Sequence, residues 1–370
     1  MSVSGELVGA RTGRGGNILR SRDRAALARI GVVAAAILAV LVCLVALTVG
    51  AAGLSLSATL DALVTAAAGR RETLDLSLAT IVLDIRLPRV LAGMLVGAAL
   101  ALSGAMMQGL FRNPLADPSL VGISSGAALA AVSSIVLGEM AAGWLPELVA
   151  RHLLPIAAFL GSLCTTIILY RLSTVNGRTS VAAMLLVGIA LAALASALIG
   201  VLVFISNDQQ LRELTFWTMG GLGGATWPKI AAVLPLMLPA FVAAPFLARS
   251  LNAMTLGHTE AFHLGIDVQR VTRLAVFVIA GAIGAAVAIS GIIGFVGLIA
   301  PHLLRTLIGP DHRTLLPAAA LFGGSLVVAA DTAARTIVAP AELPIGILTA
   351  LVGAPFFLWL LLRRRGGLVV

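Results

Sequence analysis

The sequence has little charge and almost no lysine. Only 11% of its 370 residues are charged, and Lys229 is the only lysine among 25 basic residues. A soluble domain carries about 25% charged and about 45–50% apolar residues. Here 59% of the residues are hydrophobic and the mean hydropathy is +1.07. This composition excludes a water-soluble fold, which would leave much of that apolar surface in water.

The scarcity of lysine also excludes an ATP-binding P-loop. Such a loop ends in Gly-Lys-Ser/Thr, whose lysine reaches the phosphates. Lys229 is preceded by Pro228 and followed by Ile230, so the motif is absent. The zinc-protease pattern H-E-x-x-H is missing as well. We therefore expect no enzymatic activity, no catalytic residues and no cofactor bound by this chain.

Cysteine is equally rare, and no metal site is predicted. Cys43 and Cys164 both lie inside apolar runs, where cysteine behaves as a small apolar residue. His258 and His263 are five residues apart, outside the i, i+4 spacing that places two ligands on one helix face.

What the sequence does contain is a series of long apolar runs. A membrane-spanning helix needs about 20 consecutive apolar residues. The run at 272–309 is too long for one pass, and Gly291, Gly294, Gly297 and Pro301 divide it. The sequence therefore predicts an all-α polytopic membrane protein with ten transmembrane helices, in the runs 30–53, 88–110, 120–140, 152–170, 181–205, 230–248, 272–309 (two passes), 314–334 and 342–362.

The basic residues predict the orientation. With an even number of passes both termini lie on one side, which then holds 17 basic residues against 8 on the other. Cytoplasmic loops carry the excess of arginine and lysine. We therefore expect a multi-pass inner-membrane protein with both termini in the cytoplasm. The net charge of +9 then needs no nucleic-acid partner.

The predicted organisation is a basic cytoplasmic tail at 1–29, a permease domain at 30–365 and a cytoplasmic end at 366–370. A weak internal repeat supports it. Residues 98–104 are echoed by residues 285–291, and the same offset pairs Gly97 with Gly284 and Gly122 with Gly309. Because these passes run in opposite directions, the pattern indicates an inverted repeat, as in many transporters.

Two patterns of charge point to partners. Arg86, Arg89 and Arg335 fall on the outer face, against the topological bias. Asp331 and Arg335 are four apart on one helix and could simply pair; the functional alternative is a cationic docking surface for an acidic partner. No carboxylate falls in the middle of a predicted span, which disfavours a carrier driven by protons or sodium.

Two inner segments are also candidates. The prolines of 111–118 predict a tight turn, which at the cytoplasmic mouth could form part of a gate. The loop 251–266 is predicted as two short helices broken at Gly257 and Gly265. Its apolar residues suggest either burial against a partner or packing within the chain.

Several strings together carry a family resemblance. They are Arg86-Leu87-Pro88-Arg89, Arg112-Asn113-Pro114-Leu115-Ala116-Asp117-Pro118, Gly294-Phe295-Val296-Gly297-Leu298-Ile299-Ala300-Pro301-His302, Gly309-Pro310-Asp311-His312-Arg313 and Glu342-Leu343-Pro344-Ile345-Gly346. In these strings the sequence resembles the permease subunits of the FecCD family of ABC importers, which carry ferric siderophores, haem or vitamin B12.

The resemblance implies a type II importer permease fold and a set of partners. These partners are a second permease subunit, identical or paralogous, two cytosolic ATPases that use ATP and magnesium, and a substrate-binding protein. It also implies three sites, namely docking arginines at Arg86, Arg89 and Arg335, a cytoplasmic gate at Asn113 and Leu115, and an ATPase coupling loop (251–272) with Leu256, Gly257, Ala261, Leu264 and Gly265.

The cargo is not fixed by the residues. A ferric siderophore is the commonest cargo in the family and is our expectation, with haem or vitamin B12 as alternatives. An ion-coupled secondary transporter is the rival from another class. Members of the family often have an acidic residue where His258 stands, which leaves open the identity of the matching ATPase.

Overall fold

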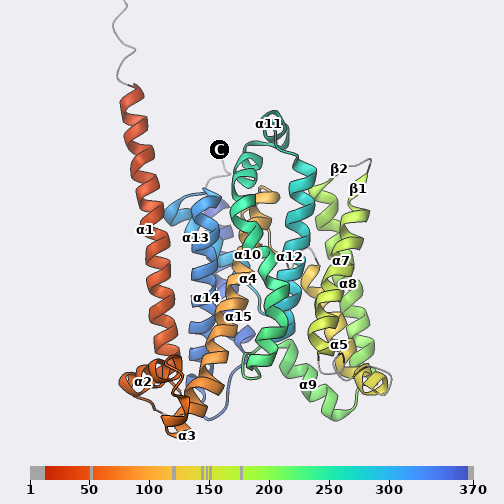
Figure 1. Cartoon of the computed structure of the whole chain (residues 1–370). Helices are drawn as coiled ribbons and strands as arrows, with labels where there is room; N and C mark the ends of the chain where they lie inside the picture. The colour runs from red at the N-terminus through yellow and green to blue at the C-terminus, as the bar shows by residue number, and fades with distance from the viewer. Residues whose placement is uncertain are drawn as a thin grey trace, which may run out of the picture.

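The computed structural model describes residues 13–365, except 51–52, 119–121, 143–145, 147–148, 150–151 and 176–177. The described chain is almost entirely helical (Figure 1). Its long helices are α1 (Gly13–Thr48), α4 (Leu87–Leu110), α5 (Ile123–Ala142), α7 (Leu153–Leu172), α8 (Val181–Ile205), α10 (Trp227–Leu256), α12 (Val268–Ser290), α13 (Val296–Ile308), α14 (His312–Ile337) and α15 (Ile345–Arg365).

Shorter elements lie at the two ends of this bundle. They are α2 (Leu56–Ala67), the 3-10 turn η1 (Arg71–Thr73), α3 (Leu76–Ala79), the π-helix η2 (Thr80–Arg86), α9 (Asp208–Thr218) and α11 (His258–His263). The strands β1 (Thr174–Val175) and β2 (Arg178–Thr179) form a small antiparallel pair with Thr174 opposite Thr179. The start of α1 and α11 lie at one end, and α2, α3 and α9 lie at the other (Figure 1).

Among the described residues, seven helices are long and apolar enough to cross a membrane. Four shorter apolar helices include parts of α5 and α15 and all of α13. Each of the nine runs predicted from the sequence overlaps one long helix, except 272–309, which overlaps two. The break predicted inside 272–309 is confirmed, because α12 ends at Ser290 and α13 begins at Val296. Ten membrane crossings stay a prediction.

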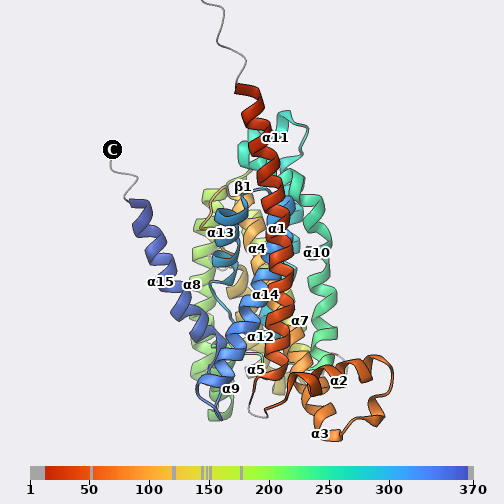
Figure 2. The same ribbon diagram turned by 90° about the vertical axis from the view of Figure 1, so that its left-hand side faces the viewer.

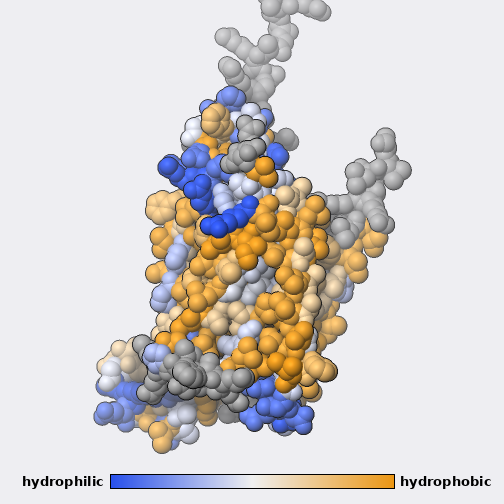
Figure 3. Space-filling model, turned by 90° about the vertical axis from the view of Figure 1, so that its right-hand side faces the viewer, coloured by the Kyte–Doolittle hydropathy of each residue, from blue (hydrophilic) through white to orange (hydrophobic). Residues whose placement is uncertain are grey.

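The centre of the bundle is formed by α4 and α12 (Figures 1 and 2). In the 18-residue apolar stretches of the spans that contain α4 and α12, 78% of the residues are buried inside the protein, against 22% for α1 and 11% for α8. Large fully buried side chains such as Leu102, Met106 and Ile279 fill this core. The peripheral helices instead expose apolar side chains, which form a belt between two hydrophilic ends (Figure 3). Such a belt matches the environment of a lipid bilayer.

Two close helix contacts lie at positions that the internal repeat relates. A Cβ atom added to Gly97 on α4 would lie 2.2 Å from the carbonyl oxygen of Gly323 on α14. At the repeat-related Gly284 on α12, it would lie 2.3 Å from Oγ of Ser162 on α7. Gly122 and Gly309, also related by the repeat, both have positive φ. α4 and α12 run in opposite directions (Figure 1), as the predicted inverted repeat requires.

Three chain breaks meet in a junction of backbone hydrogen bonds. The amide of Gly221, after α9, donates to the carbonyl of Ser290 at the end of α12 (2.8 Å). The amide of Ile345, at the start of α15, donates to Gly220 (2.9 Å). Gly220 and Gly291 have positive φ, and a Cβ atom on either would meet a carbonyl oxygen within 2.5 Å. We call these contacts the glycine junction.

Two expectations from the sequence need correction. The segment 251–266 is not two short helices, because α10 continues to Leu256 and only α11 is separate. The first run was placed at 30–53, whereas α1 begins at Gly13 and ends at Thr48. The arginines in residues 13–29 interrupt the apolar pattern, so the pattern does not indicate where the helix begins. Arginine is nevertheless a good helix former, and the helix extends through these residues. Residues 1–12 and 366–370 lie outside the described residues.

The close approach of α4 and α14 predicts the effect of one methyl group. Gly97→Ala should destabilise the protein by about 1–3 kcal/mol, because the added Cβ atom meets the Gly323 backbone and overpacks the contact. Gly200→Ala on α8 is the matched control. Nothing lies within 4 Å of its added Cβ atom, so alanine should leave stability unchanged or raise it. Thermal unfolding of the purified protein measures both.

Candidate functional site

Two predicted docking arginines hold the end of α1. Arg86 is only 4% exposed, and its Nη1 donates to the carbonyls of Leu47 (2.7 Å) and Thr48 (2.9 Å). Arg335 on α14 donates to the carbonyl of Ala46. The last carbonyls of a helix have no partner within the helix and carry partial negative charge. Two guanidinium groups therefore cap the C-terminus of α1.

The third predicted arginine, Arg89 on α4, lies between two carboxylates. Its Nε and Nη2 donate to Asp331 of α14, at 2.9 Å each for the closest pairs. Its Nη1 and Nη2 donate to the two oxygens of Glu342, again at 2.9 Å. Asp331 is 3% exposed, whereas the side chain of Glu342 is 48% exposed. The guanidinium group of Arg89 thus pairs with a buried carboxylate on one side and with a half-exposed carboxylate on the other.

Asp331 links these pairs into one network. Its Oδ2 lies 3.8 Å from Nε of Arg335, which is the i, i+4 pair expected from the sequence. The stronger partner, Arg89, is 242 residues away and was not predicted. We call Arg86, Arg89, Asp331, Arg335 and Glu342 the arginine cluster. It joins α1, α4 and α14 to the segment before α15, at the end that carries α9.

The structure brings the three predicted docking arginines together, but it also pairs them within the chain. Burial of Arg86 and Arg335 serves the packing of α1, so neither guanidinium is presented to a partner as a free surface charge. Of the three, Arg89 is the one whose partner, Glu342, borders solvent. Docking by these residues stays a prediction.

At the opposite end, the predicted gate residues lie in the turn between α4 and α5. Asn113 is exposed, and its Oδ1 accepts a hydrogen bond from the amide of Leu115 (3.0 Å). The amide of Asn113 donates back to the carbonyl of Gln108 (3.2 Å). Arg112 before it has a φ of 49°. These local bonds fix a compact turn, here called the gate turn, residues 111–118.

The predicted coupling residues surround α11. Ala261 is fully buried, while Leu256, Phe262 and Leu264 expose large apolar side chains. Gly257 and Gly265, which bracket the helix, both have positive φ and permit its sharp turns. α11 thus projects beyond the bundle (Figure 1) with apolar side chains outward, as a surface that packs against a partner would have.

His258, the first residue of α11, connects this surface to the gate turn. Its ring is hydrogen-bonded to the backbone of Leu110, the last residue of α4, and it faces Arg112. Burial, followed by the positive charge of Arg112, lowers the pKa of His258 below its usual 6.5. Burial and Arg112 thus favour the neutral ring, whereas the hydrogen bond to Leu110 favours the protonated one, and the first two outweigh it. From the sequence, the spacing of His258 disfavours a metal ligand and the family resemblance marks the residue as a departure, but neither predicts its contact with α4.

A second network ties α10 to α14 at the same end. Nδ2 of Asn252 donates to Asp311 (2.6 Å), and Oδ1 of Asn252 accepts from the backbone amide of His312 (2.9 Å). Burial opposes ionisation of Asp311, but hydrogen bonds from Arg313 and Asn252 hold its pKa below the usual value. Asp311 thus remains charged as the cap of α14.

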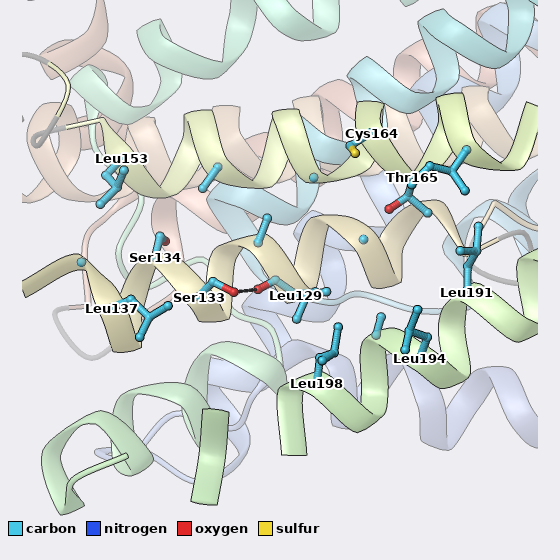
Figure 4. A pocket seen from close by; sticks show the side chains of 17 residues that line it. Leu129, Ser133, Ser134, Leu137, Leu153, Cys164, Thr165, Leu191, Leu194 and Leu198 are labelled. Carbon is cyan, nitrogen blue, oxygen red and sulfur yellow. Dashed lines mark hydrogen bonds between the residues drawn. The ribbon is translucent and has the colours of Figure 1, made fainter. Parts of the chain in front are cut away.

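An apolar groove of about 560 Å³ lies between α5, α7 and α8 (Figure 4). Leu129, Leu137, Leu153, Leu194 and Leu198 line it, and Ser133, whose hydroxyl donates to the carbonyl of Leu129, is among its few polar residues. α8 contains no charged residue in its 25 positions and exposes apolar side chains over most of its length. Within the described chain, no cluster of three or more His, Cys, Asp or Glu side chains could hold a metal ion.

Comparisons with known proteins agree on one family. The sequence profile of the FecCD transport family matches residues 37–363. The chain is 52% identical to the hemin transport system permease protein HmuU of Yersinia pestis over 283 residues, which are 76% of this chain and 83% of that protein. It is 46% identical to the cobalamin import system permease protein BtuC of Halobacterium salinarum over 285 residues, 77% of this chain and 74% of that protein.

A solved structure is similar as well. It shows a metal-chelate type ABC transporter in an inward-facing conformation. The TM-score is 0.75 with 32% sequence identity, covering 90% of this chain and 98% of the other.

The arginine cluster predicts a large effect for a single carboxylate. Asp331→Asn should destabilise the protein by about 3–5 kcal/mol, because two buried arginines then lose their shared counter-charge. Asp84→Asn is the control. Its pair with Arg71 is solvent-exposed, and its loss should change stability by about 0–1 kcal/mol. Equal thermal unfolding of the two variants in detergent would contradict a central role for Asp331.

Proposed function

This chain belongs to the FecCD transport family, and from that membership we propose that its cargo is haem, delivered by a substrate-binding protein and passed into the cytoplasm. The chain is a permease subunit of an ABC importer and a membrane protein with several apolar spans. Hydrolysis of ATP then belongs to two partner ATPases that use ATP and magnesium. A second permease subunit completes the path.

The identity to a hemin permease is the observation that carries the proposed cargo, and the uncharged α8 beside the groove supports it. A helix without charge, beside an apolar groove, contacts a ligand mainly through dispersion and loss of water. Haem offers a broad apolar face to such a surface. The 52% identity to a hemin permease favours haem over the ferric siderophore expected from the sequence, and vitamin B12 stays an alternative.

For docking, we propose that Arg89 is the contact for a carboxylate of the binding protein. Arg86 and Arg335 act indirectly by fixing the end of α1 beside it. This division of roles follows from burial, since a carboxylate that approaches from solvent meets the Glu342 edge of Arg89 first. The end with α9 would then face the binding protein, and the end with α11 the cytoplasm.

For coupling, we propose that the exposed apolar residues around α11 pack against the ATPase. Movement of α11 then reaches the gate turn through His258, whose partner Leu110 ends α4. Asn113 and Leu115, three and five residues beyond Leu110, would open or close the path as the end of α4 shifts. Because His258 contacts both elements, movement of α11 would reach the gate turn without passing through other residues.

Growth on single cargo compounds tests the proposed substrate. A strain that lacks its own importers and expresses this permease with its ATPase and binding protein should grow on haemin as iron source. Rescue by a ferric hydroxamate siderophore without rescue by haemin would restore the siderophore assignment. Rescue of a cobalamin-requiring strain by vitamin B12 alone would favour that alternative.

The low pKa of His258 predicts a pH dependence of coupling. Above pH 6.5 the ring is mostly neutral, whether it is packed or detached. As the pH falls below 6.5, a detached ring binds a proton more readily than the packed ring, whose pKa is lower. The packed position of the His258 ring is therefore destabilised in acid, because burial and the charge of Arg112 outweigh the hydrogen bond to Leu110. Haem uptake per ATP hydrolysed in proteoliposomes should fall between neutral pH and about pH 5.5. His258→Gln, which retains a donor but does not titrate, should remove this fall.

The control is His263→Gln on the same helix, which should keep the wild-type pH dependence. Loss of the dependence in both variants would contradict a specific role for His258. Leaving out the ATPase should abolish uptake at every pH. Uptake driven by an ion gradient without the ATPase would instead favour a secondary transporter.

A further inference from the structure

Arg89 presents two bidentate edges, and both are occupied from within the chain. Asp331 takes the edge formed by Nε and Nη2, and Glu342 takes the edge formed by Nη1 and Nη2. A planar guanidinium binds a carboxylate best through such paired, parallel bonds. The edge that a partner's carboxylate would use is therefore already filled by Glu342.

The two carboxylates hold Arg89 with different strength. Asp331 is buried on α14, and breaking a buried pair is costly. Glu342 is half exposed and belongs to the segment 338–344 between α14 and α15, so water screens its pair with Arg89. The hydrogen bonds from Arg89 lower the pKa of Glu342, which keeps it ionised at neutral pH. Glu342 is charged, correctly oriented and replaceable, while Asp331 stays in place.

We propose that Glu342 is an internal placeholder for the carboxylate of the docking partner. It occupies the solvent-side edge of Arg89 in the free permease and leaves when a carboxylate of the binding protein takes that edge. The exchange trades one Arg–carboxylate pair for another, so Arg89 is never left without a counter-charge beside Asp331. This proposal rests on the docking role proposed above for Arg89.

Displacement of Glu342 acts on the start of α15. The amide of Leu343 donates to the carbonyl of Ala334 (3.0 Å). Two residues further, the amide of Ile345 donates to Gly220 in the glycine junction (2.9 Å), and the amide of Gly346 donates to the adjacent Met219 (3.0 Å). Release of the Glu342 side chain loosens the segment that leads into α15. The backbone hydrogen bonds that follow this segment connect the start of α15 to the ends of α9 and α12. Docking is thereby transmitted to helices inside the membrane.

The turn after α9 supports this geometry. A Cβ atom added to Gly223 would lie 3.2 Å from Oε2 of Glu342 and 3.8 Å from Nη1 of Arg89. The turn therefore lies directly beside the pair. The absence of a side chain at this position leaves space through which Glu342 can leave and a carboxylate of the partner can enter.

Glu342→Gln tests the proposal with two independent measurements. The first needs no partner: backbone hydrogen exchange at residues 343–346 of the purified permease should be several-fold faster than in wild type. The second is the affinity of the assembled importer for its own purified binding protein. Because an internal competitor is removed, the dissociation constant should fall about two- to fivefold, the equivalent of a half-exposed ion pair. Asp84→Asn, which removes a carboxylate from Arg71 instead, should change neither quantity.

Arg89→Gln separates this proposal from the proposed docking site. If it leaves the affinity for the binding protein unchanged, Arg89 is not the docking contact and the proposed function fails at that point. If Arg89→Gln weakens binding but Glu342→Gln weakens it too, Glu342 is part of the docking surface and the placeholder is overturned. Unchanged exchange at 343–346 in Glu342→Gln would also overturn it, because the pair would then not restrain α15.

Discussion

One buried carboxylate, Asp331, determines how the end of the bundle is assembled. A charge at 3% exposure persists in an apolar surrounding only when it is paired and hydrogen-bonded. Asp331 meets this condition through Arg89 and Arg335, and Arg335 in turn caps α1. At this end of the bundle Asp331 therefore joins α4 to α14 and supports the Arg335 cap of α1.

α4 runs as one continuous helix from the arginine cluster to the contact with His258. Its 24 residues span about 36 Å, from Arg89 near its first turn to Leu110 at its last residue. Arg89 belongs to the arginine cluster, and Leu110 bonds to His258 of α11. Close packing along the helix, as at Gly97 and Gly104, leaves little room for independent bending.

Features that depend on neighbouring residues could be predicted from the sequence. The run 181–205 matches α8 because polar Ser180 and Ser206 flank an unbroken apolar segment, and the glycines after Ser290 marked the end of α12. Features that depend on distant residues could not. Arg89 meets partners 242 and 253 residues away, and nothing local distinguishes Glu342 from any other loop carboxylate. The amphipathic α9 was not predicted from the sequence, because a segment with so few apolar residues resembles a polar loop.

The capping of α1 has a consequence for how the chain is made. Arg86 lies 39 residues after Leu47, but Arg335 lies 289 residues after Ala46. During synthesis Arg86 is available to the carbonyls of Leu47 and Thr48 long before α14 exists, whereas the carbonyl of Ala46 must wait for Arg335. The cap of α1 is therefore complete only after α14 has been synthesised.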